Sequence, residues 1–536
     1  MTRRKKVEFD TADLDLSRHR APWLQRIAAS RHGMAATANY NATAVAEGIL
    51  EKGGNAMDAA VAAAFALGVC EPAASGLGGQ TMILYYDAEE GKTIALDGSS
   101  RAPHRIEPGE LAKEKSLRGH SATTVPSTPA VLAYALKTFG TQELATILNP
   151  VIGLAEKGYK VSELQNSLTK RELKHLQNGS AAQFFLKNNK PYPIGSVLKQ
   201  PVLANTFKKI AKNGVEDFYQ GSIAQIIHKD MIANDGLIRD DDLAQIPWPI
   251  ERKPLSCRFS GKRVFTIGEP GAGRTLIEML NIVSQFPKTM LNPDTPEGAL
   301  ILCEIIRRAN IDRRDRPFDH NFYPQIQGKQ MLKSEYGKFV AQQIKARFKG
   351  TGETTHLSVM DKFGNVVALT QSIERVYGSF AASPELGFLY NNYMSAFDYD
   401  DITHPNYLRP SAVPWASVAP TIVFKNKKPY LSIGSPGSER ITSAILQVLL
   451  RLNYQSPYDA VAAPRLHCSV GGRVSMEASR MRNDIPQLLE KHGYSVDLRD
   501  PYSFYMGCIQ LVVHENGEFI GVADPRRDGS AGGPRQ

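Results

Sequence analysis

Residues 354–372 read TTHLSVMDKFGNVVALTQS, and this stretch decides the fold prediction. Two runs rich in β-branched residues flank a linker of turn-forming residues at 361–365. This pattern predicts an antiparallel hairpin. A turn centred in the linker places Thr354 across the ladder from the segment that holds Ser372 and Glu374. A hydroxyl beside another hydroxyl and a carboxylate can support nucleophilic chemistry, although a solvent-exposed polar strand end explains the same residues.

The chain around this hairpin predicts a layered α+β sandwich. Asn55 is placed as a helix N-cap with Asp58 completing a capping box, and the following AAVAAAFALGV is apolar on all sides, so this helix should be buried. Thr81–Tyr86 is strand-like, and the chain from about 130 to 350 is mainly helical. After residue 354 strand-like runs alternate with helical stretches, which indicates strands and helices grouped into layers.

A second feature is the turn GSPGS at 434–438, between the strand-like YLSI and a helical stretch at 440–452. A glycine-rich turn from strand to helix presents backbone N–H groups at the positive end of a helix, which suits the binding of an oxyanion. A plain tight turn accounts for the same residues.

Composition narrows the function classes. The chain has 536 residues, a net charge of +10, 42% hydrophobic and 22% charged residues, as expected for a soluble globular protein. Its basic runs at 3–6 and 307–316 lack an aromatic-rich module, so we do not expect nucleic-acid binding. Five scattered cysteines without a C-x-x-C pair indicate neither a zinc module nor a disulfide framework. No apolar run follows the basic start, so we expect a cytoplasmic protein that does not enter membranes.

The chain resembles the gamma-glutamyltranspeptidase family over almost its whole length. The matching words, in order, are GGNAMDAAVAAAFALGVCEP, SGLGGQTMILYY, VPSTPA, TTHLSVMDKFGNVVAL, APTIVF, GSPGSERI, APRLH and ADPRRDG. The resemblance implies the four-layer αββα sandwich of N-terminal nucleophile hydrolases. It also implies a precursor that cuts itself between Glu353 and Thr354. The products would be a large subunit, 1–353, and a small subunit, 354–536, that form a heterodimer; a higher oligomer is left open.

The resemblance also implies a mechanism and a substrate class. A threonine hydroxyl is a poor nucleophile without a base, and scission would give Thr354 a free α-amine of pKa about 7.7–8.0 to take that role. The expected reaction is cleavage of γ-glutamyl amides such as glutathione, with transfer of the acyl group to water, an amino acid or a peptide. Neither a cofactor nor a metal is expected.

Several site residues follow from the same resemblance. Ser372 matches a hydroxyl residue that touches the nucleophile, and Gly437 and Ser438 match the oxyanion-hole pair. Glu374 matches a substrate contact, and Ser417 matches the second of two paired serines. Tyr393, Arg101 and these two residues make up the predicted substrate-binding set.

The sequence departs from the family at the groups that hold glutamate. Ser99 stands where the family has the arginine for the α-carboxylate, and Arg101, two residues on, is predicted to substitute for it. Ala396 stands where an aspartate holds the α-amine, and Ala416 replaces the first paired serine. We favour γ-glutamyl substrates because Glu374 and Arg101 can replace part of the lost contacts with the glutamyl group.

Two alternatives stay open. The same chemistry on a non-glutamyl acyl amide, such as a cephalosporin side chain or oxamate, is the first. An unprocessed, non-catalytic binding protein is the second.

Three further features have simpler interpretations. His356 is interpreted as structural, because its side chain stands about 7 Å from that of Thr354 along a strand. The glycine-rich stretch 268–275 lacks the lysine of a phosphate loop and is expected to border a pocket. Arg526 is expected to pair with a carboxylate inside the fold.

Overall fold

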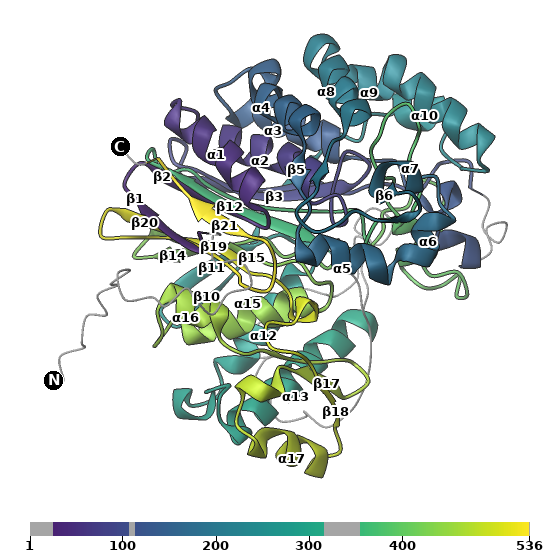
Figure 1. The fold of residues 1–536 in the computed structure, drawn as a ribbon. Helices are drawn as coiled ribbons and strands as arrows, with labels where there is room; N and C mark the ends of the chain where they lie inside the picture. The colour runs from purple at the N-terminus through teal and green to yellow at the C-terminus, as the bar shows by residue number, and fades with distance from the viewer. Residues whose placement is uncertain (1–24, 107–112, 316–353, 535–536) are drawn as a thin grey trace.

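The computed structural model describes residues 25–106, 113–315 and 354–534, and the predicted hairpin lies at its centre (Figure 1). β12, Thr355–Asp361, pairs antiparallel with β13, Val366–Ser372, and Thr355 lies opposite Gln371. One further step in this register brings Thr354 opposite Ser372. The register lies within one residue of the prediction. The turn is closed by Asp361, whose Oδ1 accepts the backbone N–H groups of Phe363 and Asn365 at 2.8 and 3.0 Å.

Two seven-stranded sheets, each with every neighbouring pair antiparallel, form the middle of the molecule. Sheet I runs in the order β1 (Ile27–Ser30), β20 (Glu518–Ala523), β19 (Gln510–Glu515), β15 (Lys428–Gly434), β14 (Thr421–Lys425), β11 (Lys262–Thr266), β10 (Leu255–Phe259). Sheet II runs in the order β21 (Ser530–Gly532), β2 (Gly33–Thr37), β12, β13, β3 (Gln80–Asp87), β4 (Lys92–Gly98), β9 (Ile250–Arg252).

The central strands of sheet II are buried on both faces. Leu357 and Val359 of β12 point into an apolar cluster shared with helix α2, Ala56–Cys70, whereas Met360 joins the core between the two sheets. The inter-sheet face of β12 also carries Ser358, whose Oγ accepts a hydrogen bond from Ser432 Oγ of β15 at 3.0 Å. Side chains on a strand alternate between faces, so Thr354 belongs to the face that looks toward sheet I.

Helices cover the outer face of each sheet (Figure 1). Beside α2, the sheet II side holds α1 (Tyr40–Glu51), α3 (Thr128–Phe139), α4 (Leu144–Lys157) and α8 (Pro201–Asn213). The sheet I side holds α12 (Gly273–Val283), α13 (Pro296–Asp315), α15 (Arg440–Arg451), α16 (Pro457–Ala462) and α17 (Asp484–Lys491).

Smaller elements complete the fold. They are α5 (Glu163–Arg171), α6 (Leu173–Gln177), α7 (Ala182–Phe185), α9 (Glu216–Gln220), α10 (Ser222–Ala233), α11 (Asp240–Ala244), β5 (Tyr159–Lys160), β6 (Leu186–Lys187), β7 (Lys190–Pro191), β8 (Val197–Leu198), β16 (Leu466–Cys468), β17 (Arg473–Met476) and β18 (Ser495–Leu498). Within the described ranges, no helix combines the length and apolar content needed to cross a bilayer.

Helix α2 explains how the first helical layer approaches sheet II closely. Its predicted capping box is confirmed: the Asn55 side chain accepts the N–H of Asp58, and the Asp58 carboxylate accepts the N–H of Asn55. The small alanine side chains of this helix are buried on all sides. The prediction of mixed α/β structure with antiparallel sheets is therefore confirmed, and the hairpin is fixed between two layers of core.

Candidate active site

Thr354 lies at the entrance to β12, and 3% of its surface is exposed. Across the inter-sheet space, β15 ends at Gly434 beside the His356 ring; a Cβ on Gly434 would stand 2.3 Å from that ring. Only glycine therefore allows β15 to pack over His356. The turn that follows Gly434 consequently begins on the same side of sheet II as the Thr354 side chain.

The His356 ring is a structural group in this arrangement. Its Nδ1 lies 2.8 Å from Thr370 Oγ1 and its Nε2 lies 3.1 Å from Ser358 Oγ. Burial lowers the pKa of this imidazole to about 3, so the ring is neutral at physiological pH. These contacts agree with the structural interpretation and leave the ring no role as a base for Thr354.

Ser372 stands at the end of β13 among other predicted site residues. Its Oγ accepts the backbone N–H of Glu374 at 2.8 Å, which fixes Glu374 in a left-handed conformation with φ of 73°. The hydroxyl of Tyr393 also hydrogen-bonds Ser372; burial raises the pKa of this phenol well above its usual range, and the contacts with Ser372 and Gln80 lower it in part. The structure thus gathers Ser372, Glu374 and Tyr393 opposite the start of β12.

The predicted oxyanion turn connects β15 to α15. Gly437 and Ser438 have φ values of 121° and 54°, so both lie in the left-handed region. Within the part of the chain that the structure describes, neither of their N–H groups donates a hydrogen bond. Ser435 stabilises the turn, because its Oγ accepts the N–H of Cys508 at 3.0 Å. The turn can therefore offer two N–H donors to a developing negative charge.

Three residues that hold the start of β12 were missed from the sequence. Arg527 Nη1 donates to the carbonyl oxygen of Thr354 at 3.3 Å and lies 3.5 Å from the Glu71 carboxylate. Thr355 Oγ1 donates to the same carboxylate at 2.5 Å. Burial raises the pKa of Glu71 to about 7, and the Arg527 charge and the Thr355 hydrogen bond limit the rise. The Arg527–Glu71 pair thus positions the backbone of Thr354 through its carbonyl oxygen.

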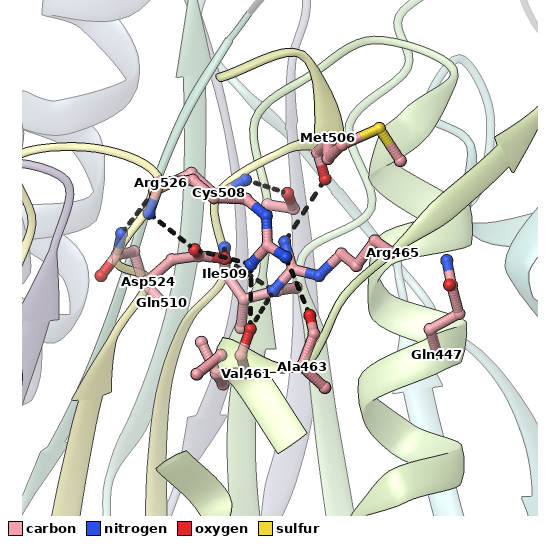
Figure 2. A network of polar contacts seen from close by, with 12 residues as sticks. Gln447, Val461, Ala463, Arg465, Met506, Cys508, Ile509, Gln510, Asp524 and Arg526 are labelled. Carbon is pink, nitrogen blue, oxygen red and sulfur yellow. Dashed lines mark hydrogen bonds and ion pairs between the residues drawn. The ribbon is translucent and has the colours of Figure 1, made fainter. Parts of the chain in front are cut away.

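Arg526, the residue before Arg527, is anchored by buried carboxylates. The Arg526 guanidinium bridges Glu477 at 2.5 Å and Asp524 at 3.1 Å, and Arg465 lies 2.6 Å from the same Asp524. Figure 2 shows the two guanidinium groups gathered beside Asp524 and the backbone of Val461 and Ala463. Burial alone would raise the pKa of Asp524, but Arg465 and Arg526 keep it below its usual range. Arg526 therefore pairs with buried carboxylates, as the sequence predicts.

A cavity of about 310 Å³ lies beside the turn that holds Gly437 and Ser438, at the sheet I side of the molecule. Its lining includes Glu439, which directly follows Ser438, and Ala396. The stretch Glu269–Thr275 borders it, in agreement with the prediction of a pocket-edge loop there. The cavity therefore opens next to the oxyanion turn.

Comparison with known proteins decides the family. The family model for gamma-glutamyltranspeptidase matches residues 42–533. The chain belongs to this family. It is 32% identical to a glutathione hydrolase proenzyme of Escherichia coli, over 93% of this chain and 91% of that protein. It is also 31% identical to an acylase ACY 1 proenzyme of a Pseudomonas species, over 94% of each chain.

A solved structure shares the fold. The crystal structure of a cephalosporin acylase from Bacillus halodurans superposes with a TM-score of 0.86 at 27% identity, covering 99% of this chain and all of that one. The chain is therefore a hydrolase and acyltransferase of the gamma-glutamyltransferase type.

The residues that depart from the family are placed as follows. Ser99 Oγ donates to Asp97 Oδ1 at 2.5 Å, so its hydroxyl hydrogen bonds to a carboxylate of the same segment. Arg101 forms a backbone bridge with Val125 and is not part of the cavity lining. Ala396 lines the cavity with a methyl group. Glu353, the residue predicted to precede the cut, lies outside the described residues.

Ser417 and the neighbouring Ala416 are held by a residue that the sequence did not single out. Arg313, near the end of α13, donates from Nη2 to the Ala416 carbonyl at 2.7 Å, and its Nη1 lies 3.4 Å from Ser417 Oγ. The guanidinium also lies over the Trp415 ring, 4.6 Å from its centroid. The Arg313 guanidinium thus lies at the segment that holds Ala416 and Ser417. It comes from α13, whereas the resemblance aligns the family's arginine with Ser99.

Proposed function

We propose that this chain is a precursor that cuts itself between Glu353 and Thr354, and that Thr354 then acts as the nucleophile of an amide hydrolase and acyltransferase. The observation that carries the proposal is the position of Thr354, buried at the start of β12 opposite Ser372 and on the side of the Gly437–Ser438 turn. The name "proenzyme" of the relatives supports it.

The chemistry follows from the groups at this centre. Thr354 Oγ attacks the carbonyl carbon of Glu353, its proton passes to the leaving nitrogen, and the resulting ester is hydrolysed by water. The product is a free α-amine on Thr354. In the mature site this amine takes the hydroxyl proton, directly or through a water, while the N–H groups of Gly437 and Ser438 stabilise the oxyanion. The acyl-enzyme is then released to water or to an acceptor amine.

The two fragments would remain one folded body of the four-layer αββα type. Sheet I combines β1, β10 and β11 from the first fragment with strands of the second, and sheet II combines β2, β3, β4 and β9 with β12, β13 and β21. Scission at one peptide bond breaks none of these pairings, so we propose a heterodimer of residues 1–353 and 354–536. The cytoplasmic location stays a prediction.

γ-Glutamyl amides such as glutathione are the first candidate substrates. The naming of curated relatives as glutathione hydrolases supports this choice. The second candidate is an acyl amide without an amino-acid end. Ala396 and Ser99 favour it, because neither can bind an α-ammonium or an α-carboxylate ionically, and relatives named acylases support it.

Denaturing electrophoresis of the purified wild type, Thr354→Ser and Thr354→Ala proteins tests the proposal. We expect two fragments of 353 and 183 residues from the 536-residue wild type and from Thr354→Ser, which keeps a hydroxyl nucleophile. Thr354→Ala should stay unbroken and lose at least about 10³-fold in turnover of any acyl anilide. An active, unbroken wild-type chain would contradict the mechanism, and an unbroken, inactive one would favour a binding protein.

A further inference from the structure

One buried side chain in the cavity has no partner. Asn310 of α13 is 4% exposed and lines the cavity, and neither its Nδ2 nor its Oδ1 forms a hydrogen bond with any residue that the structure describes. An amide buried without partners carries most of its desolvation penalty uncompensated. Such a group on a cavity wall indicates a ligand that supplies the missing hydrogen bonds.

Arg313 lies on the same helix three residues on, so the two side chains share one face of α13. A guanidinium has five N–H donors, and described residues engage two of the Arg313 donors, through Ala416 O and Ser417 Oγ. The Trp415 ring lies against the same guanidinium. Burial lowers the pKa of Arg313 to about 10, with Glu439 raising it in part, so the group stays charged at neutral pH.

The carboxylates of the cavity are already matched. Glu269 lies 3.1 Å from Arg274 Nε. Asp398 Oδ1 accepts the N–H groups of Asp400 and Asp401 at 3.0 and 2.8 Å. Glu439 is the carboxylate that interacts most strongly with Arg313. The cavity therefore offers an unpartnered amide and, three residues on, a part-buried guanidinium that interacts with Glu439 but keeps N–H donors that no described residue engages.

We propose that Arg313 and Asn310 are the specificity-determining residues of this enzyme, and that they bind a carboxylate at the far end of the substrate's acyl group without requiring an α-ammonium. This inference rests on the proposed function. The preferred substrates are then amides of dicarboxylic acids, of which a γ-glutamyl amide is the amino-substituted case. An anionic ligand gains charge-assisted hydrogen bonds from a guanidinium that is partly shielded from water.

The position of Arg313 connects this subsite with the reaction centre. Glu374, whose N–H bonds Ser372 Oγ, interacts electrostatically with Arg313, and so does Glu439, which follows Ser438. Arg313 therefore interacts with one residue from each of the two segments that flank the proposed reaction centre. Ala396, where the family has its ammonium-binding aspartate, leaves an apolar wall at this place.

Three p-nitroanilides that share one acyl chain length test the inference on the wild-type enzyme. They are the glutaryl compound, with a carboxylate only; the γ-glutamyl compound, with a carboxylate and an ammonium; and the pentanoyl compound, with neither. We expect kcat/KM for glutaryl to exceed that for pentanoyl by about 10-fold or more, and that for γ-glutamyl not to exceed that for glutaryl.

Variants then assign the effect to residues. Arg313→Met should lower kcat/KM for the glutaryl compound by about 10- to 150-fold, mainly through KM, and change the pentanoyl value by less than about threefold. Arg313→Lys should restore part of the loss. Asn310→Leu should act in the same direction by about 3- to 10-fold without lowering Tm. Arg258→Met, which removes an exposed charge of β10, is the matched control and should change neither substrate.

The outcomes are distinct. Arg313 also holds Ala416 and Ser417, so Arg313→Met can fail to fold or to cut itself; the wild-type ranking and Asn310→Leu then decide. Turnover of pentanoyl equal to or above that of glutaryl, or an equal loss on both substrates in Asn310→Leu, would overturn the inference alone. A wild-type chain that is neither cut nor active would instead remove the proposed function.

Discussion

The proposed reaction centre and the cavity beside it are built in different ways. The proposed centre uses strand ends and a turn: Thr354 and Ser372 at the ends of paired strands, and the backbone N–H groups of Gly437 and Ser438. The cavity uses side chains from a helix end and from loops, among them Asn310, Arg313 and Ala396. A backbone donor survives substitution, whereas a side-chain anchor does not. The chemistry can therefore be retained while the recognised acyl group changes.

The strongest challenge to the backbone-built centre, short of removing Thr354, is Gly437→Val. Gly437 has φ of 121°, and a Cβ there would stand 3.1 Å from Gly507 Cα, so a branched side chain must displace the turn. We expect scission and kcat to fall by about 10²- to 10³-fold, the usual effect of losing an oxyanion donor. Gly364→Ala, also at positive φ but in the hairpin turn, should affect stability only. Equal losses in both variants would contradict this assignment.

The burial of the Glu71 carboxyl predicts a pH dependence of stability. The pKa of Glu71 is raised from 4.5 to about 7 in the folded protein, so between these values the folded state binds a proton that the unfolded state has lost. Stability should therefore decrease as pH rises from about 4.5 to 7, by about 1.4 kcal/mol per unit of pKa difference.

Urea unfolding of the wild type and Glu71→Gln at several pH values measures this effect. The glutamine variant should lack the decrease, whereas Glu51→Gln, at an exposed position of α1, should keep it. A Glu71→Gln profile that parallels the wild type would show that Glu71 titrates normally.

The side-chain-built cavity can be changed toward the family pattern. Ala396→Asp restores a carboxylate where the family binds an α-ammonium, and it should raise the ratio of kcat/KM for γ-glutamyl to that for glutaryl anilide by about 10-fold. The kcat for pentanoyl anilide serves as the control and should stay within about threefold. An unchanged ratio would indicate that the acyl end does not reach Ala396.

The smallest effect concerns Ser438, which adopts φ of 54° at a position where the family usually has glycine. Ser438→Gly should raise the free energy of unfolding by up to about 1 kcal/mol, because glycine adopts left-handed conformations without strain. The backbone N–H is retained, so kcat/KM should stay within about threefold. Ser435→Gly in the same turn should instead lower the free energy of unfolding, because Ser435 Oγ accepts the N–H of Cys508. Thermal melts of the two variants separate these cases.

Local sequence patterns predicted the elements that are stabilised by residues close together in the chain. The β12–β13 hairpin follows from alternation and turn residues, the α2 start from its capping box, and the strand–turn–helix at 434–440 from glycine spacing. The short strands β1, β2 and β21 were not predicted, because their stability comes from partners far away in the chain. β1 pairs with β20, for example, so that Ile27 lies opposite Val522.

The same reason explains the site residues that the sequence missed. Arg527 reaches Glu71 and the Thr354 carbonyl, and Arg313 reaches Ala416, over separations that no local pattern encodes. The resemblance pointed to Ser99 and Ala396 as lost anchors but could not indicate which other cation stands nearby. Arg101, the substitute chosen by sequence proximity, stays a prediction.

Mass spectrometry of the active protein tests the central assignment most directly. Two polypeptides should appear, one with Thr354 as its first residue, and their masses should sum to that of the precursor plus one water. After a brief reaction with an acyl anilide, an acyl adduct should appear on the fragment that begins at Thr354. An active preparation with an unbroken chain, or with the adduct on the other fragment, would contradict the account.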